Sequence, residues 1–433
     1  MSTTLLRLAT AGSVDDGKST LVGRLLHDTK SILADQMAAV ERVSRARGFE
    51  GADLALLTDG LRAEREQGIT IDVAYRYFAT PRRSFILADC PGHVQYTRNT
   101  VTGSSTADVI VLLVDVRHGV LEQTRRHLAV ASLLRVPHVI VAINKVDLVG
   151  FDADTYREVA ADVDRVAAGL GLSGVHTVPV SALLGDNVAE SSPRTPWYDG
   201  PALLELLESL PAGTEPDTQP FRFPVQYVIR PQSGAVSAEL REYRGYAGRI
   251  ASGVVRPGDE VVILPSGRRT TVAGVDTADG TLDEGFAPQS VTLRLTDDLD
   301  VARGDLIAAA KSAPQPSADV DGLVCWLAER PLVAGARVLV KHGARTVQAV
   351  VRGVDAVLDL DTLVGVPAER LELNDIGRVR LRLAGEIAAD PYARNRENGA
   401  FLLIDAQQGG TLAAGMITGT DPDAPEPGDD WVI

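Results

Sequence analysis

The sequence predicts an α/β domain with a mostly parallel sheet and helices on both faces, followed by two antiparallel β-barrel domains. Up to about residue 210, strongly apolar strand-like runs alternate with segments of helical spacing. Runs this uniformly apolar suit a parallel sheet that is covered on both faces. From residue 221 the pattern changes to short alternating strands separated by Gly and Pro turns, which is typical of antiparallel barrels.

Two segments of linker-like composition predict that the chain forms three domains. Residues 211–220 and 312–317 are rich in proline and polar residues and are interpreted as linkers. We therefore expect a nucleotide-binding domain over 1–212 and barrel domains over 220–312 and 318–433. A chain of 433 residues is long enough for two or three domains with substantial cores.

Within the first domain, the expected strands and helices follow one another along the chain. The strands are expected over 5–11, 84–89, 109–115, 138–143 and 176–180. A helix is expected from residue 21, and others over 122–134, 154–169 and 201–210, the last with Pro201 in its first turn. The barrel strands are expected within 224–229, 246–253, 259–267, 290–295, 324–327, 337–343, 346–351, 378–383 and 399–405.

Residues 12–20 read GSVDDGKST and fit G-x-x-x-x-G-K-[ST], a loop whose backbone amides surround nucleotide phosphates. Gly12 and Gly17 permit backbone angles that other residues avoid. Lys18 is expected to reach the β- and γ-phosphates and stabilise developing charge, and Ser19 to bind Mg²⁺. The residues expected at the phosphates are Gly12, Ser13, Val14, Asp15, Asp16, Gly17, Lys18, Ser19 and Thr20.

A base-reading segment follows the fourth expected strand. Residues 144–147 are Asn144, Lys145, Val146 and Asp147. Guanine presents two donors on one edge, N1–H and the 2-amino group, and the Asp147 carboxylate can accept both. Adenine lacks these donors, and a site built around donors rejects such an analogue by about 10⁴-fold. The Lys145 stem can lie along the purine, and Asn144 can link this segment to the phosphate loop.

A backbone amide for guanine O6 is expected from the loop after the last strand. That loop contains Ser181, Ala182 and Leu183. Many GTPases have lysine at the last of these positions, but the contact comes from the backbone, so Leu183 should cause little loss.

Two more segments are expected to sense the γ-phosphate. The strand over 84–89 ends in Asp89, Cys90, Pro91, Gly92 and His93. Asp89 is expected to hold Mg²⁺, the Gly92 amide to contact a γ-oxygen, and His93 to orient the attacking water. Thr70 is expected as a second hydroxyl ligand of Mg²⁺, which together with Gly92 reports whether the γ-phosphate is present. Arg62 and Arg65 are expected to be solvated charges rather than catalytic arginines.

Bulk properties exclude several classes of protein. The formal net charge is −15, which disfavours broad binding to a nucleic-acid backbone. Two cysteines and seven scattered histidines indicate neither a disulfide framework nor a metal cluster. The N-terminus lacks a signal-peptide pattern, and no apolar run reaches about 18 residues. We expect a cytoplasmic protein that binds neither membranes nor nucleic acid.

The motifs resemble those of translational-type GTPases related to elongation factor Tu, including the histidine directly after D-x-P-G. Longer strings resemble the large, GTP-hydrolysing subunit of heterodimeric bacterial sulfate adenylyltransferase. These strings include DDGKSTLVGRLLHD (15–28), DCPGHVQYTRNTVTGSSTAD (89–108), RGYAGRIASGVVRPGDEVVILPSG (244–267) and FLLIDAQQGGTLAAGMI (401–417). The resemblance extends over the whole chain.

This resemblance implies a P-loop GTPase that binds GTP with Mg²⁺ and couples its hydrolysis to sulfate activation. It implies a small, ATP-pyrophosphatase-like partner subunit that makes adenosine 5′-phosphosulfate and pyrophosphate from ATP and sulfate. The chain has no S-G-G-x-D-S-like loop and no second P-loop, so we expect neither the adenylyl-transfer site nor a fused adenylylsulfate kinase within it. Two alternatives stay open: a translation factor that carries aminoacyl-tRNA, and a regulatory GTPase whose barrels dock another protein.

Overall fold

The computed structural model describes residues 4–46, 52–57, 72–212, 218–231 and 241–420. The chain divides into two compact units, one formed mainly by residues 1–213 and the other by 214–358 and 365–430. Each unit is described on its own. The expected domain limits at 212, 220, 312 and 318 stay predictions.

The first unit contains a six-stranded sheet in the order β2-β3-β1-β4-β5-β6. Its pairings are parallel except between β2 and β3, so the predicted mostly parallel sheet is confirmed. The strands are β1 (Thr4–Gly12), β2 (Ala74–Ala79), β3 (Arg83–Asp89), β4 (Val109–Asp115), β5 (His138–Asn144) and β6 (Val175–Val180).

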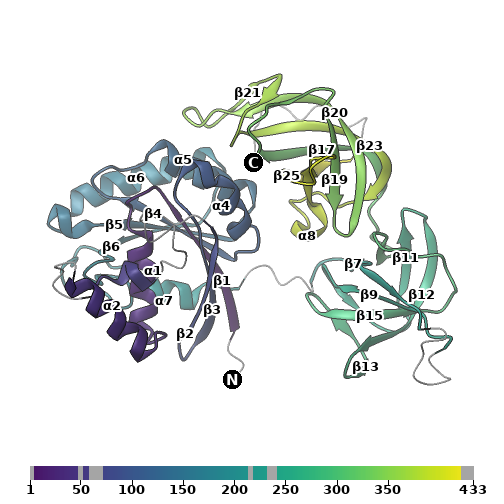
Figure 1. Ribbon diagram of the computed structural model, residues 1–433, viewed down its shortest axis with the longest axis horizontal. Coiled ribbons are helices and arrows are strands. Elements are labelled where there is room, and N and C mark those ends of the chain that lie inside the picture. The colour runs from purple at the N-terminus through teal and green to yellow at the C-terminus, as the bar shows by residue number, and fades with distance from the viewer. Residues whose placement is uncertain (1–3, 47–51, 58–71, 213–217, 232–240, 421–433) are drawn as a thin grey trace. The chain divides into compact units, whose positions relative to one another are not determined.

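Helices cover both faces of this sheet, with α1 and α7 on one face and α4, α5 and α6 on the other (Figure 1). The first face buries a core in which leucines of α1 and α7 pack against the strands. The helical elements are α1 (Lys18–Asp28), α2 (Ala34–Ala46), η1 (Leu54–Leu57), η2 (Val94–Tyr96), α4 (Thr97–Ser104), α5 (Glu122–Leu133), η3 (Val146–Val149), α6 (Ala153–Gly169) and α7 (Leu203–Ser209).

Several details differ from the sequence prediction in this unit, among them helix α4, which was not expected. The edge strand β2 was not expected, because its sequence AYRYFA buries only Phe78 and carries a weak apolar signal. The helix expected over 201–210 begins at Leu203 with Ala202 as its N-cap, so Pro201 precedes the helix instead of lying in its first turn. Proline in that position still prevents the helix from extending backwards.

The second unit consists of antiparallel sheets. In its first part, an eight-stranded sheet runs β7-β16-β11-β12-β15-β9-β8, with β13 paired to β12, and β10 pairs with β14. The strands are β7 (Arg222–Pro224), β8 (Tyr227–Ile229), β9 (Gly245–Arg249), β10 (Val254–Val255), β11 (Glu260–Leu264), β12 (Arg268–Thr277), β13 (Gly280–Leu282), β14 (Gly285–Phe286), β15 (Ser290–Leu295) and β16 (Leu306–Ala309). Their apolar faces enclose one core that includes Phe223, Tyr246 and Leu293.

The last part of the chain closes into a barrel. Its sheet runs β19-β24-β25-β17-β23-β20-β21, and a further pairing between β19 and β20 closes six of these strands into a ring. The elements are β17 (Pro316–Trp326), β18 (Leu332–Val333), β19 (Arg337–His342), β20 (Arg345–Leu358), β21 (Gly365–Pro367), β22 (Arg370–Leu371), β23 (Ile376–Ala388), α8 (Arg396–Gly399), β24 (Ala400–Ile404) and β25 (Thr411–Gly419).

The linker expected over 312–317 is shorter than predicted, since β17 begins at Pro316 and pairs that residue with Ala388. Proline is tolerated at the first position of a strand, where its missing N–H removes no inner ladder bond. Composition alone therefore overestimated this linker.

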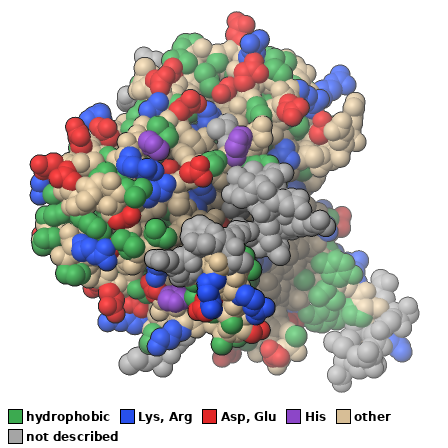
Figure 2. Space-filling model, turned by 60° about the vertical axis from the view of Figure 1, so that its left-hand side comes forward, with side chains coloured by type: hydrophobic (Ala, Val, Ile, Leu, Met, Phe, Trp, Pro, Cys, Tyr) green, Lys and Arg blue, Asp and Glu red, His purple; other side chains and the backbone are tan. Residues whose placement is uncertain are grey.

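Basic and acidic side chains intermingle on the face drawn in Figure 2, without a continuous basic stripe. Among the described residues, no helix combines the length and the apolar character needed to cross a membrane.

Candidate functional site

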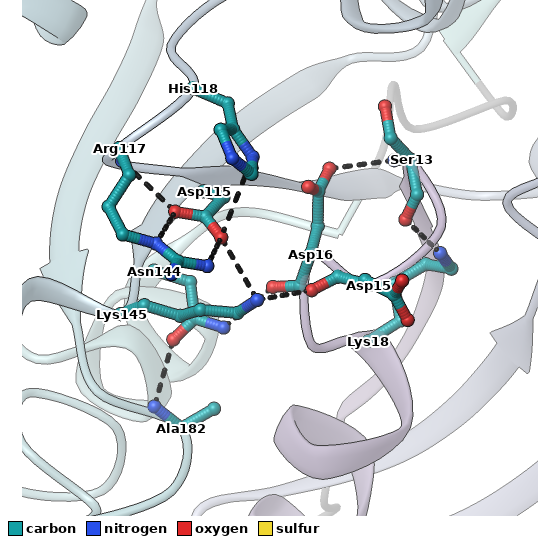
Figure 3. A network of polar contacts seen from close by, with 10 residues as sticks. All are labelled: Ser13, Asp15, Asp16, Lys18, Asp115, Arg117, His118, Asn144, Lys145 and Ala182. Atoms are coloured by element: carbon teal, nitrogen blue, oxygen red, sulfur yellow. Dashed lines mark hydrogen bonds and ion pairs between the residues drawn. The ribbon is translucent and has the colours of Figure 1, made fainter. Parts of the chain in front are cut away.

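The predicted motifs meet at one edge of the parallel sheet. Parallel strands end on the same side, and the register sets Thr10 of β1 beside Asp89 of β3 and Asp115 of β4 beside Asn144 of β5. In open α/β sheets, ligands bind outside the carboxyl ends of the strands. The segments that follow β1, β3, β5 and β6 are therefore gathered at the position where a ligand is expected. Figure 3 shows polar contacts among residues from the segments after β1, β4, β5 and β6.

The phosphate loop curls around Lys18, the first residue of α1. Only 7% of Lys18 is exposed, and its Nζ donates hydrogen bonds to the carbonyl oxygens of Gly12 (2.9 Å) and Ser13 (2.8 Å). Burial lowers the pKa of Lys18 from its ordinary value, and the neighbouring Asp16 carboxylate opposes that shift. The lysine is thus held at the centre of the loop by the loop's own carbonyl groups.

Asp16 fixes the loop from within. Its Oδ2 accepts a hydrogen bond from the Ser13 amide at 2.7 Å, and its side chain is buried. Burial raises the pKa of Asp16, although the Ser13 amide and Lys18 lower it. Val14 and Asp15 are exposed, and Ser19 and Thr20 are partly buried at the start of α1.

Two glycines of the loop are required by geometry. Gly12 has φ 144° and Gly17 has φ 97°, a region that other residues rarely adopt. A Cβ on Gly17 would lie 2.4 Å from Nδ2 of Asn144, and one on Gly12 would lie 2.8 Å from the Leu113 carbonyl oxygen. A side chain at either position would push the loop away from the sheet.

The segment after β3 lies against the phosphate loop. Asp89 is 1% exposed, and its Oδ1 accepts a hydrogen bond from the Thr10 hydroxyl at 2.9 Å. A Cβ on Gly92 would lie 2.2 Å from Nζ of Lys18 and 2.5 Å from the Gly12 carbonyl oxygen. Pro91 and Cys90 are buried, and burial raises the pKa of the Cys90 thiol, which suits packing rather than chemistry.

His93 follows with its ring exposed. Its Nδ1 accepts a hydrogen bond from the Gln95 amide at 3.3 Å, and its ring lies edge-on to Tyr96 at 6.1 Å. This arrangement leaves Nε2 as the ring nitrogen available to water. Thr70, Arg62 and Arg65 lie outside the described residues.

The segment after β5 is tied to the phosphate loop, as the sequence predicts. Nδ2 of Asn144 donates to the carbonyl oxygen of Asp16 at 2.7 Å, and Lys145 Nζ donates to that of Asp15. Lys145 has φ 64°, and the buried Val146 starts the short helix η3. No described residue donates a hydrogen bond to the Asp147 carboxylate.

Asp115 is a site residue that sequence reasoning missed. Its side chain is 1% exposed and accepts hydrogen bonds from the Arg117 guanidinium at 3.0 and 2.6 Å, and Lys145 Nζ lies 2.9 Å away (Figure 3). Burial alone would raise the pKa of Asp115, but the hydrogen bonds from Arg117 and Lys145 hold it well below its ordinary value. Its position at the end of an apolar strand, beside the strand that ends in Asn144, was the available signal.

The loop after β6 contacts the same network. The Ala182 amide donates to Oδ1 of Asn144 at 3.0 Å, so Asn144 joins the phosphate loop to residues 181–183. Ser181 is buried, whereas 63% of Leu183 is exposed. The Ala182 amide therefore has an acceptor within the described residues.

Comparisons with known proteins agree with this geometry. Residues 3–213 match the Elongation factor Tu GTP binding domain, and residues 319–418 match the GTP-eEF1A C-terminal domain-like family. Sulfate adenylyltransferase subunit 1 of Alteromonas mediterranea is 48% identical over 415 residues, which cover 95% of this chain and 86% of that protein. The chain belongs to the sulfate adenylyltransferase subunit 1 family.

Other relatives of this family have similar identity. Sulfate adenylyltransferase subunit 1 of Methylorubrum populi is 50% identical over 95% of this chain and 87% of its own length. The bifunctional enzyme CysN/CysC of Mycobacterium tuberculosis is 52% identical over 96% of this chain, which spans 67% of that enzyme. A structure of sup35 complexed with GDP aligns with 97% of this chain and 95% of the sup35 chain, at 22% identity and a TM-score of 0.43.

Replacing Asp115 by asparagine is expected to destabilise the GTPase domain by about 1–3 kcal/mol at pH 7, because Lys145 and Arg117 lose their buried anionic acceptor. The folded-state pKa of Asp115 lies below the unfolded value, so its stabilisation is complete above about pH 4 and lost as the pH falls. The measurement is urea unfolding of both proteins at pH 7 and pH 3, following the transition that GTP shifts. An equal difference at both pH values would contradict this role.

Proposed function

We propose that this chain binds GTP at the edge formed by β1, β3, β5 and β6, hydrolyses it, and couples that hydrolysis to sulfate activation on a partner subunit. The main support for the GTP site is that the phosphate loop, Gly92 and the segment starting at Asn144 converge around Lys18. Membership in the sulfate adenylyltransferase subunit 1 family supports the purpose of the hydrolysis.

Catalysis in this proposal is mainly positioning and charge stabilisation. Lys18 lies where developing charge on the β- and γ-phosphates needs stabilisation, and His93 orients the attacking water. The Gly92 amide contacts a γ-oxygen and, together with Thr70, reports whether the γ-phosphate is present. The Asp147 carboxylate reads the guanine edge, and the loop of Ser181, Ala182 and Leu183 contacts O6.

The oxygen donors present fit Mg²⁺, which binds hydroxyls, carboxylates and phosphates. Asp89 is held in place by the Thr10 hydroxyl, and Ser19 is the second residue of helix α1, directly after Lys18. Thr70 is proposed as the third protein ligand. The bound ion would neutralise charge on the phosphate oxygens.

The partner in this proposal is a small, ATP-pyrophosphatase-like catalytic subunit. It joins ATP and sulfate into adenosine 5′-phosphosulfate and releases pyrophosphate. Because the equilibrium of this reaction is strongly unfavourable, we propose that coupled GTP hydrolysis drives it. We propose a cytoplasmic location for the complex.

A direct test measures GTP hydrolysis by the complex with and without ATP and sulfate. We expect hydrolysis to rise only when both substrates are present. A rate of GTP hydrolysis that does not depend on ATP and sulfate but increases with aminoacyl-tRNA would instead favour a translation factor. The net charge of −15 and the intermingled charges in Figure 2 oppose that alternative.

A further inference from the structure

One backbone amide in the loop after β6 lacks an acceptor, while its neighbours all have one. The Ser181 amide donates to the Asp186 carbonyl oxygen (3.1 Å) and the Ala182 amide to Asn144 Oδ1 (3.0 Å). The Leu184 amide donates to Ser181 Oγ (3.2 Å) and the Gly185 amide to the Ser181 carbonyl oxygen (2.7 Å). Among the described residues, the Leu183 amide has none.

Arg24 holds the two carbonyl groups that flank this amide. It lies on α1, six residues after Lys18, and its Nε donates to the Ala182 carbonyl oxygen at 3.2 Å. Its Nη2 donates to the Leu183 carbonyl oxygen, and its Nη1 lies 3.7 Å from Asp28 on the same helix. The side chain is 19% exposed. A planar guanidinium with several donors in a fixed fork suits this paired contact.

The Ala182 carbonyl and the Leu183 amide belong to one peptide group. A trans peptide is planar, and its C=O and N–H bonds point in opposite directions. By fixing the carbonyl toward α1, Arg24 fixes the direction of the Leu183 N–H on the other side of the loop. A cation at the carbonyl also polarises the peptide and makes its N–H a stronger donor.

We propose that Arg24 is a positioning residue for guanine specificity, which orients the Leu183 N–H toward O6 of the base. This inference rests on the proposed GTP site and adds the residue that reads the 6-position. It also couples the phosphate side to the base side, because Arg24 and Lys18 share helix α1. A single rigid element then sets both contacts.

Two nucleotide analogues distinguish the two proposed contacts with the guanine base. Inosine triphosphate keeps O6 and N1–H but lacks the 2-amino group that Asp147 is proposed to bind. 6-Thioguanosine triphosphate keeps N1–H and the 2-amino group but carries sulfur, a weak acceptor, in place of O6. The thio analogue therefore probes the Leu183 amide, and inosine triphosphate probes Asp147.

The experiment measures equilibrium binding of GTP, the thio analogue, inosine triphosphate and ATP to the wild-type chain and to Arg24→Ala. Loss of one neutral hydrogen bond corresponds to about 5–10-fold in affinity. We expect Arg24→Ala to weaken GTP binding by about that factor and to abolish the preference for GTP over the thio analogue. The preference for GTP over inosine triphosphate should stay unchanged.

Arg24→Lys keeps the charge with a single ammonium and should restore part of the thio discrimination. Arg157→Ala is the matched control, since Arg157 is an exposed residue of α6 that forms an ion pair with Asp154. If Arg24→Ala does not fold, the same comparison between wild type and Arg24→Lys decides the question.

Equal weakening of GTP, the thio analogue and inosine triphosphate would overturn the inference, because a merely structural role affects all three alike. In that case wild-type selection of GTP over ATP would persist, and the proposed GTP site would stand. A wild-type chain that binds ATP as tightly as GTP would overturn both.

Discussion

Replacing His93 by alanine is expected to leave GTP bound and to slow its hydrolysis by about 10²–10⁴-fold, the range typical of a positioned side chain that assists water attack. The ring is exposed at the end of the Asp89 segment, directly after Gly92, which lies against Lys18. Because Nδ1 accepts the Gln95 amide, Nε2 is available to orient a water. No buried packing is lost when this ring is removed.

The measurement is single-turnover hydrolysis at saturating GTP, together with equilibrium binding. His176→Ala is a suitable control, since His176 is an exposed residue near the amino end of strand β6, whereas the candidate site lies at the carboxyl ends of the strands. A His93→Ala variant with a normal turnover rate would remove His93 from the catalytic machinery. Weaker GTP binding at an unchanged rate would assign it to the binding site instead.

Much of the fold could be predicted because the relevant signals are local. The apolar runs of β4 and β5 are buried throughout, so each strand was visible without knowledge of its partners. Strand β2 was missed because an edge strand that buries only Phe78 lacks such a run. The extent of β17 depends on pairing with β23, which composition does not reveal.

The candidate site likewise contains residues that the sequence predicts and residues that it does not. Glycines and Lys18 of the phosphate loop are constrained by short spacing, and the structure places them together as expected. Asp115 and Arg24 were missed because their partners lie far along the chain. Asp115 meets Lys145 only through the register of β4 and β5, and Arg24 meets Ala182 across 158 positions. Single charged residues of this kind carry no motif.

Replacing Asp147 by asparagine is expected to reduce GTP affinity by about 10⁴-fold and to create a preference for xanthosine triphosphate. The Asp147 carboxylate can accept from both N1–H and the 2-amino group of guanine. Asparagine presents one acceptor and one donor, which matches N1–H and the 2-oxo group of xanthine.

The neighbouring contacts make this result specific to the base. Asn144 links the phosphate loop to the loop after β6, and Lys145 is held by Asp115, so the segment stays in place when Asp147 changes. Since no described residue donates to the Asp147 carboxylate, its replacement breaks no hydrogen bond within the described part of the chain. The control is Asp152→Asn, at the exposed N-cap of α6, which should leave nucleotide choice unchanged. Competition binding between the two triphosphates measures the switch, and unchanged GTP affinity in Asp147→Asn would exclude this carboxylate from base recognition.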